Sequence, residues 1–478
     1  MTSVARIAER VRNGGETAGA VASRTAAALE DSTGLNATLH WSRELLHRRA
    51  GEITERVSAG EQLPLAGVPV ALKDNIVSTD EPTTCASRML VDYVSPYEAT
   101  AVTRLREAGA LLAGKANLDE FAMGSSTEHS AFGRVRHPLD PERVPGGSSG
   151  GSAALVAAGV VPAALGSETG GSVRQPASFC GVVGVKPTYG RVSRYGLVAF
   201  GSSLDCISSF GRTVDDAARV LAVISGPDPF DSTTVDRPPI APPEPPRDLR
   251  GITIGLPREY FPDDLDPGVR AGTDRTIAAL KELGAELRQV SLPHTALAVP
   301  TYYIIAPAEA AANLARYDGV RYGQRRIGPN GDIRALYQAT RGEGFGAEVR
   351  RRILVGTYVL SAGYAAQYYA KAQRARALIA ADFAAVFAGG VDLLFTPTTP
   401  TPAFRAGEKT DDPVAMYLAD IFVSPASLAG LPAMSLPIGR SDGLPIGGQL
   451  IAPMFHDEQM LAAAAVLERA VPAVEEVR

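Results

Sequence analysis

The sequence predicts an α/β protein in which one sheet runs through both halves of the chain. Apolar runs of strand length alternate with amphipathic helical patterns after about residue 60. The alternation stops at a proline-rich stretch and then resumes. Hydrophobic residues make up 45% of the 478 positions, which is ample for the deep core that such a sheet requires.

The N-terminal segment predicts a layer of helices. Residues 19–32 and 40–60 carry apolar side chains three and four positions apart, which is typical of helices with one buried face. The first twenty residues mix charged and apolar side chains and contain no secretory apolar core, so we expect no export and a cytoplasmic location. We predict that residues 1–60 pack on the core and that residues 61–478 form a single domain.

The first half of the domain predicts a βαβ-like unit. Residues 63–79 pass through a Gly-Pro turn into an apolar run that ends at Lys73, the pattern of a buried strand. A helical pattern over residues 100–108 then stops at Gly109, and a short apolar strand follows and ends at Lys115. This order favours the α/β class.

The second half begins after a surface connection at about residues 226–250, where clustered prolines exclude helices and central strands. Residues 301–385 are expected to be mostly helical, and they are rich in arginine. The remaining predicted elements are a strand in 252–261, a helix in 267–287, a strand in 285–293 and a buried strand with a proline-fixed loop in 391–404.

Composition excludes several classes of function. The formal net charge is -5 and no long block of one sign occurs, so the whole chain lacks the charge pattern of a nucleic-acid or membrane-binding protein. Any role with RNA would need a partner. The longest apolar run, residues 153–166, is broken by glycine and proline and is too short for a membrane helix. Cys85, Cys180 and Cys206 are too few and too scattered for a disulfide framework or a zinc site, and they fit a reducing compartment.

Two loops rich in glycine and serine, in residues 145–159 and 166–181, raise the question of a phosphate site. A P-loop requires a lysine and a hydroxyl residue directly after its last glycine, but the first loop continues into alanines, and the nearest downstream lysine is Lys186. Neither loop spells the dinucleotide-binding pattern. The sequence therefore does not favour nucleotide binding.

The same loops also suggest a serine nucleophile. Residues 146–150, GGSSG, match the G-x-S-x-G pattern of α/β-hydrolases, whose serine is activated by a histidine. The only histidines that follow, His294 and His456, are expected in exposed loops, which argues against that arrangement.

A lysine is the alternative activator, and it must be neutral to accept a proton. Because a free lysine has a pKa of about 10.4, the site must lower the pKa by roughly three units, worth about 4 kcal/mol. Lys73 is the best candidate, since it ends a buried strand and Asp74 should face the other side of that strand. A buried lysine paired with a carboxylate for purely structural reasons is the alternative.

Three motifs together resemble the amidase signature family over nearly the whole chain: GVPVALKDN from Gly67, PGGSSGGSAALVA from Pro145, and GSETGGSVRQPASFCGVVGVKPTYGRVSRYG from Gly166. Within that family the chain is most similar to the branch of glutamyl-tRNA(Gln) amidotransferase A subunits, through the runs AEAAANLARYDGVRYG, GFGAEVRRRILVGTYVLSAGY and TPTTPTPAF. The resemblance implies an α/β fold with a mixed central β-sheet flanked by helices.

The family resemblance also implies a Ser-cisSer-Lys triad. Ser172 would be the nucleophile, Ser148 the bridging serine on a cis peptide, and Lys73 the base. The backbone N–H groups of Thr169, Gly170 and Gly171, which lead to Ser172, would stabilise the developing oxyanion.

Glutamine is the substrate that the resemblance implies, with Arg352 at the α-carboxylate, Asp420 at the α-ammonium group and Tyr303 along the side chain. Ammonia would pass to a partner B subunit, which amidates Glu-tRNA(Gln), or Asp-tRNA(Asn), with ATP and magnesium. A small C subunit would complete a heterotrimer. This chain itself would need no cofactor and would meet the tRNA mainly through the partner.

Two other functions remain open from the sequence. A stand-alone amidase of the same family would act on small amides without a partner. A silent scaffold in a tRNA-modifying assembly would need a broken triad, whereas Lys73, Ser148 and Ser172 are all present.

The sequence departs from the family pattern at four positions: Glu168, Cys206, Ser427 and Gly448. Glu168 adds a methylene next to the oxyanion loop. Cys206 and Ser427 remove amide groups near the core, so we expect weaker hydrogen-bonded support of the site there.

Overall fold

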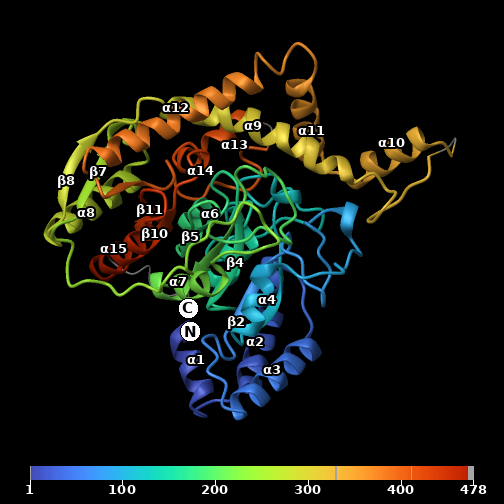
Figure 1. The fold of residues 1–478 in the computed structure, drawn as a ribbon, viewed down its shortest axis with the longest axis horizontal. Coiled ribbons are helices and arrows are strands. Elements are labelled where there is room, and N and C mark those ends of the chain that lie inside the picture. Colours follow the sequence, from blue (N-terminus) through green and yellow to red (C-terminus); the bar gives the residue numbers. More distant parts are fainter. Residues whose placement is uncertain (1, 329–330, 411, 472–478) are drawn as a thin grey trace.

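The computed structural model describes residues 2–328, 331–410 and 412–471 (Figure 1). Its strands are β1 Thr38–His40, β2 Pro69–Lys73, β3 Leu111–Ala116, β4 Ala163–Glu168, β5 Val183–Lys186, β6 Cys206–Gly211, β7 Thr253–Pro257, β8 Glu286–Val290, β9 Leu393–Pro397, β10 Ala433–Ser441 and β11 Leu444–Ile451.

The helices are α1 Val4–Arg12, α2 Ala18–Asp31, α3 Arg43–Ser58, α4 Thr100–Glu107, α5 Gly150–Ala157, α6 Arg174–Cys180, α7 Val214–Ile224, α8 Pro267–Glu282, α9 Ala298–Asn313, α10 Ile333–Gly344, α11 Ala347–Leu360, α12 Tyr369–Ala388, α13 Pro413–Leu418, α14 Ser424–Leu428 and α15 Asp457–Ala470. The predicted helices are present, but the expectation of loops in 145–159 and 166–181 was wrong in part, because α5 and α6 lie within these segments.

Among the described residues, eleven strands form one mixed sheet in the order β1-β3-β2-β4-β6-β5-β10-β11-β9-β7-β8. β2 pairs in parallel with β3 and β4, and β7 pairs in parallel with β8 and β9. The middle of the sheet, from β4 to β9, is antiparallel. This arrangement confirms the mixed α/β fold and the single sheet through both halves.

The N-terminal layer consists of α1, α2 and α3, and the hydroxyls of Thr17 and Ser42 cap the last two of these helices. The expectation of a wholly helical segment was wrong at one place. β1, only three residues long, pairs antiparallel with the neighbouring strand β3. The run is too short for an alternating pattern, so only its partner strand reveals it. The division of the chain at residue 60 stays a prediction.

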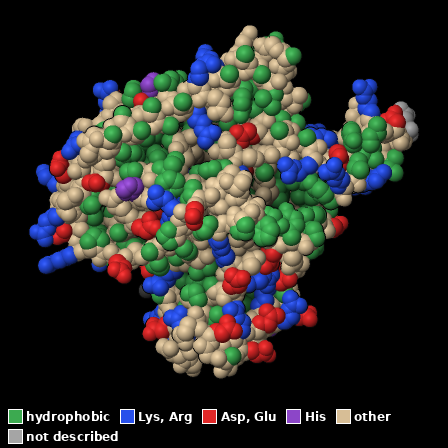
Figure 2. Space-filling model, viewed as in Figure 1, with side chains coloured by type: hydrophobic (Ala, Val, Ile, Leu, Met, Phe, Trp, Pro, Cys, Tyr) green, Lys and Arg blue, Asp and Glu red, His purple; other side chains and the backbone are tan. Residues whose placement is uncertain are grey.

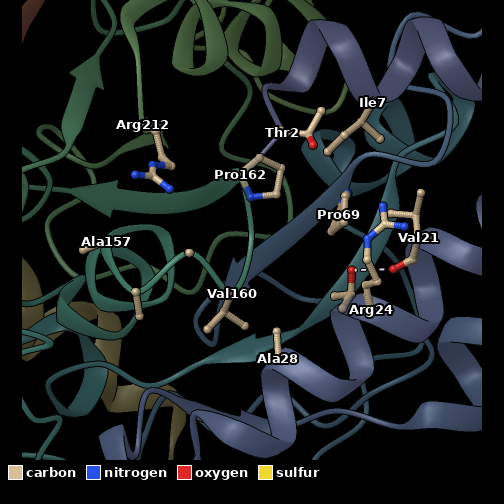
Figure 3. Close-up of a pocket in the computed structure, with 13 residues that line it drawn as sticks. Thr2, Ile7, Val21, Arg24, Ala28, Pro69, Ala157, Val160, Pro162 and Arg212 are labelled. Atoms are coloured by element: carbon tan, nitrogen blue, oxygen red, sulfur yellow. Dashed lines mark hydrogen bonds between the residues drawn. The ribbon is translucent and has the colours of Figure 1, made fainter. Parts of the chain in front are cut away.

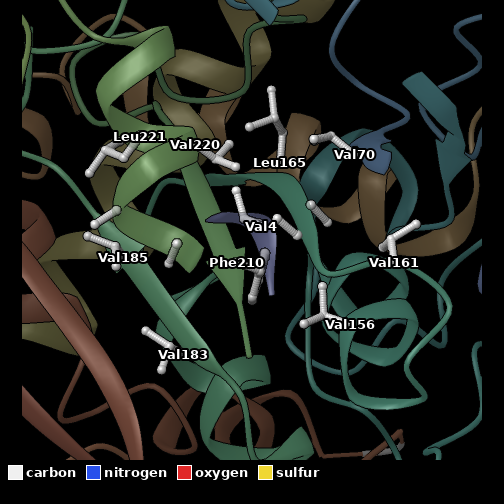
Figure 4. Packing of buried hydrophobic residues seen from close by; sticks show 14 of the residues in the cluster. Val4, Val70, Val156, Val161, Leu165, Val183, Val185, Phe210, Val220 and Leu221 are labelled. Atoms are coloured by element: carbon white, nitrogen blue, oxygen red, sulfur yellow. The ribbon is translucent and has the colours of Figure 1, made fainter. Parts of the chain in front are cut away.

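The core around the central strands is dry on both faces of the sheet. All residues of β2, β3 and β4 are buried. Figure 4 shows Val220 and Leu221 of α7 beside the side chains of strands β5 and β6, with Leu165 of β4 beside Val70 of β2. Burying one such side chain contributes about 1.5–3 kcal/mol, and this layer fixes where the strand ends lie.

Helices α9, α11 and α12 cross the sheet on one side, and α10 projects from the body of the molecule (Figure 1). Residues 226–250 contain neither helix nor strand and join β6 and α7 to the second half. Within residues 2–328, 331–410 and 412–471, none of the helices combines the length and hydropathy needed to cross a bilayer.

The contact between α9 and α11 leaves no room for a side chain at Gly356. A Cβ atom there would overlap the carbonyl oxygen of Pro307 in α9. We expect Gly356→Ala to lower the free energy of unfolding by about 1–3 kcal/mol, because the two helices must separate. Gly342→Ala, in α10 with open space around the new methyl group, should change it by less than about 1 kcal/mol. Urea unfolding of both variants checks this, and equal stabilities would contradict it.

Candidate active site

Lys73 ends β2, which lies between β3 and β4 in the sheet, and its side chain is fully buried. Its Nζ donates to Ser148 Oγ at 2.8 Å, to Ser149 Oγ at 2.7 Å and to the carbonyl oxygen of Ser167 at 3.1 Å. The peptide bond between Gly147 and Ser148 is cis. The structure therefore brings together the predicted base and the predicted bridging serine.

Burial lowers the pKa of Lys73 to about 7, although the carboxylates of Asp119, Asp205 and Glu168 favour the charged amine. The direction and size match what a lysine base requires. Asp74, the residue after Lys73, lies 3.4 Å from the Nζ of Lys115 in β3. The lysine that pairs with a buried carboxylate is therefore Lys115 and not Lys73.

Ser172, the predicted nucleophile, lies in the loop before α6 and is 7% exposed. Its carbonyl oxygen accepts a hydrogen bond from the N–H of Ser149 at 3.2 Å. The loop of Ser172 and the loop of Ser148 are thus joined directly through their backbones. A small exposed fraction on Ser172 leaves its hydroxyl accessible while its surroundings remain dry.

The turn of Thr169, Gly170 and Gly171 precedes Ser172 and is buried. A Cβ atom on Gly170 would lie 2.8 Å from the ring of Tyr302, and one on Gly171 would overlap the side chain of Val423. Glycine at both positions lets helices of the second half pack against the turn. The turn is therefore the place where the two halves of the site meet.

Glu168 and Ser427 both form hydrogen bonds at this turn. Although burial alone would raise the pKa of Glu168, the ion pair with Arg174 lowers it. The Ser427 hydroxyl donates to Glu168 at 2.9 Å and accepts from Arg174 at 2.8 Å. At Ser427 the hydroxyl thus bonds to both members of the ion pair, and the expectation of weaker support there stays a prediction.

The other two residues that depart from the family pattern, Cys206 and Gly448, lie within strands. Cys206, in β6, is the register partner of Glu168 in β4, and burial raises the pKa of its thiol. Gly448 lies in β11, where a Cβ atom would contact Ile438 and Phe395 at 2.8 Å. A larger residue at position 448 would have to displace these core side chains.

Arg352 is buried in α11, and its Nε donates to Glu348 at 2.8 Å. The guanidinium group lies 5.3 Å from the ring centroid of Tyr303, 5.6 Å from that of Phe200 and 5.9 Å from that of Tyr417. Tyr303 and Tyr417 stack with centroids 3.5 Å apart. The predicted binding residues Arg352 and Tyr303 are therefore in one cationic, aromatic-walled group.

Asp420 is buried beside the glycine turn. Its Oδ2 accepts a hydrogen bond from the hydroxyl of Ser125, and its Oδ1 has no partner among the described residues. That free oxygen lies 3.4 Å from the position that a Cβ atom on Gly171 would take. Burial raises the pKa of Asp420 to about 7. A buried acceptor without a donor is suited to a ligand cation.

Three residues near the site were missing from the sequence prediction. Ser149 shares the amine of Lys73, and the doubled serine in GGSSG was the only sequence signal for it. The N–H of Asp119 donates to the carbonyl oxygen of Ser148 at 3.2 Å. Asp205 accepts from the Thr169 hydroxyl at 2.6 Å and from the N–H of Phe200 at 2.9 Å, and burial raises its pKa to about 6.

Asp205 thereby connects two parts of the site. Its carboxylate holds Thr169 in the predicted oxyanion turn and Phe200, whose ring lies against Arg352. No local sequence pattern could show this link, because it joins three segments far apart in the chain.

A cavity of about 380 Å³ lies between the N-terminal helices and the loop after α5 (Figure 3). Arg24, at its wall, pairs with Glu16. None of the predicted site residues lines it. Within the described part of the chain, no group of three or more His, Cys, Asp or Glu side chains is placed to hold a metal ion.

Comparison with known proteins agrees with the family resemblance of the sequence. The family described as Amidase matches residues 21–461. The protein named as the A subunit of glutamyl-tRNA(Gln) amidotransferase from Carboxydothermus hydrogenoformans is 56% identical over 436 residues, covering 90% of this chain and 88% of that protein. The protein of the same name from Moorella thermoacetica is 58% identical over 416 residues, covering 86% and 84%.

A solved structure is also similar. The crystal structure of the A subunit of glutamyl-tRNA(Gln) amidotransferase from Thermotoga maritima superposes with a TM-score of 0.75 at 49% sequence identity. The match covers 86% of this chain and 85% of that chain.

The depressed pKa of Lys73 predicts a pH-dependent stability. Its pKa is about 7 in the folded chain and about 10.5 in the unfolded chain, so between these values unfolding takes up a proton. The unfolding free energy of the wild type should therefore rise relative to Lys73→Met, by about 2 kcal/mol between pH 7 and pH 9.

Urea unfolding at pH 7, 8 and 9 measures this difference. Lys281→Met, at an exposed position of α8, is the matched control and should follow the wild type at all three pH values. A constant difference between the wild type and Lys73→Met would mean that the amine of Lys73 is not desolvated.

Proposed function

The chain belongs to the amidase family, and from this premise we propose that it is the glutamine-hydrolysing subunit of a tRNA-dependent amidotransferase. The observation that supports this most strongly is the buried amine of Lys73 hydrogen-bonded to Ser148, beside the loop that carries Ser172. The names of the similar proteins supply the tRNA-dependent reaction.

The reaction proceeds by acyl transfer. Ser172 Oγ attacks the side-chain amide carbon of glutamine, and its proton passes through the hydroxyl of Ser148 to the neutral amine of Lys73. The N–H groups of the turn from Thr169 to Ser172 stabilise the oxyanion. Lys73 returns the proton through Ser148 to the leaving nitrogen, so ammonia departs and a glutamyl ester of Ser172 remains. Water then hydrolyses the ester to glutamate, with the same proton relay.

Two buried side chains bind the two charged groups of the substrate. The guanidinium of Arg352 binds the α-carboxylate, and the free Oδ1 of Asp420 accepts from the α-ammonium group. Tyr303 lies along the substrate side chain. Arg352 keeps its own counter-ion in Glu348, which orients the guanidinium before the substrate arrives.

Ammonia is the product that the assembly uses. A partner B subunit would amidate Glu-tRNA(Gln), or Asp-tRNA(Asn), with ATP and magnesium, and a C subunit would complete the heterotrimer. The chain described here contributes no nucleotide or metal chemistry to that step. A cytoplasmic location follows from this role in protein synthesis.

Ammonia release from glutamine tests the proposal. Ser172→Ala should lower the rate by about three orders of magnitude or more, because no acyl-enzyme forms. Ser23→Ala, at an exposed position of α2, is the control and should match the wild type. With B and C subunits, ATP and Glu-tRNA(Gln), the wild type should convert the ammonia into Gln-tRNA. Fast hydrolysis of many amides that ignores the partners would instead identify a stand-alone amidase.

Asp420→Asn tests the ammonium site. The glutamine KM should rise by about 10- to 100-fold, because a charge-assisted hydrogen bond is lost, while the KM of propionamide should change little. In the wild type, the glutamine KM should also rise as the pH falls below about 7, since the carboxyl group then becomes protonated. Steady-state kinetics from pH 6 to 8 measure both effects.

The control for this experiment is Asp274→Asn, at an exposed position of α8, which should leave both KM values unchanged. Equal changes for glutamine and propionamide in Asp420→Asn would remove Asp420 from the ammonium site.

A further inference from the structure

Residues 316–351, here called the basic arm, carry a charge opposite to that of the chain. The arm contains eight arginines and four acidic residues, a formal net charge of +4, whereas the whole chain has -5. The net charge of the whole chain therefore does not show the local excess of positive charge in the arm. The arm includes α10 and the loop before it.

Three arginines of the arm have no internal role. Arg321, Arg325 and Arg334 are exposed, and no hydrogen bond or ion pair links their side chains to any residue within the described ranges. By contrast, Arg341 donates to the carbonyl oxygens of Leu314 and Tyr317 and so holds the arm together. The three exposed arginines are therefore not needed for the local fold.

The shape of the arm presents these charges to a large partner. α10 stands away from the body of the molecule (Figure 1), and Lys and Arg side chains gather on the projection and at its base (Figure 2). A twelve-residue helix is about 18 Å long, enough to follow several phosphates of a nucleic-acid backbone.

Exposed aromatic rings lie among the arginines. Tyr322 is 36% exposed and Tyr337 is 39% exposed. Arginine with exposed tyrosine is the combination that binds phosphates and stacks on unpaired bases.

We propose that the basic arm binds the backbone of the RNA substrate of the assembly. This inference rests on the proposed function, which places a tRNA in the same complex. The contact is made to phosphates and carries little sequence specificity. The arm would add to the RNA contacts of the partner rather than replace them.

Fluorescence anisotropy of a labelled tRNA(Gln) transcript with the full chain, from 50 to 200 mM KCl, tests the proposal. The triple variant Arg321→Gln, Arg325→Gln, Arg334→Gln should bind roughly tenfold more weakly at 50 mM KCl. The slope of log K against log salt should shrink by about two to three. The corresponding Arg→Lys triple should keep most of the affinity, because the charges remain.

The matched control is the triple variant Arg6→Gln, Arg247→Gln, Arg275→Gln, which removes three exposed charges from α1, the proline-rich connection and α8. It should bind the transcript as the wild type does. Glutaminase activity, measured in parallel, should be unchanged in every variant, so loss of RNA binding is separable from failure of the proposed function.

Two results would overturn the inference. If the basic-arm variant and the control bind the transcript equally, the arm does not contact RNA. If RNA binding is unchanged but the variant no longer co-elutes with the B subunit in gel filtration, the arm is a protein interface.

Discussion

The whole site depends on keeping one amine away from water. Lys73 ends a strand that lies between two other buried strands, and this position lowers its pKa to about 7. The difference from the ordinary pKa of the amine corresponds to about 5 kcal/mol of disfavoured charge, which the packing of the sheet must sustain. Contacts with Ser148, Ser149 and the Ser167 carbonyl oxygen orient the amine. In its neutral form the amine donates at most two of these hydrogen bonds and accepts from a serine hydroxyl.

A second constraint joins two separately packed cores. The strands that carry Lys73 and the loop of Ser148 belong to one hydrophobic cluster, whereas Tyr302 and Phe200 belong to another that includes the helices of the second half. Gly170 and Gly171 lie at the boundary, where Tyr302 and Val423 contact the turn. The groups proposed for acyl transfer thus lie on the side of the sheet, and the groups proposed to bind the substrate charges lie on the side of the helices.

Periodicity was sufficient to predict β2, β3, β7, β8 and β9, which lie toward the two ends of the sheet, but it did not predict the strands between them, β4, β6, β5, β10 and β11. It could not predict β1, which has three residues and exists only through its pairing with β3. The motifs around Lys73, Ser148 and Ser172 were readable because each is local. The partners of Asp205 and Asp420 were not, since Thr169 with Phe200, and Ser125 with Gly171, meet these carboxylates only in three dimensions. The arginine-rich character of residues 301–385 was readable from the sequence, but which of these arginines lack a partner could be seen only in the structure.

The dry environment acts in opposite directions on the two ionisable groups that the reaction needs. Burial lowers the pKa of the Lys73 amine and raises that of the Asp420 carboxyl, and both reach about 7. The proposed mechanism requires a neutral amine and a charged carboxylate, so a fall in pH below 7 would remove both states at once. In the proposed binding mode, the α-ammonium group of the substrate would contact Asp420 and favour its charged carboxylate. Substrate binding would therefore restore the required charge of Asp420, whereas the neutral form of Lys73 would depend on the packing of the sheet alone.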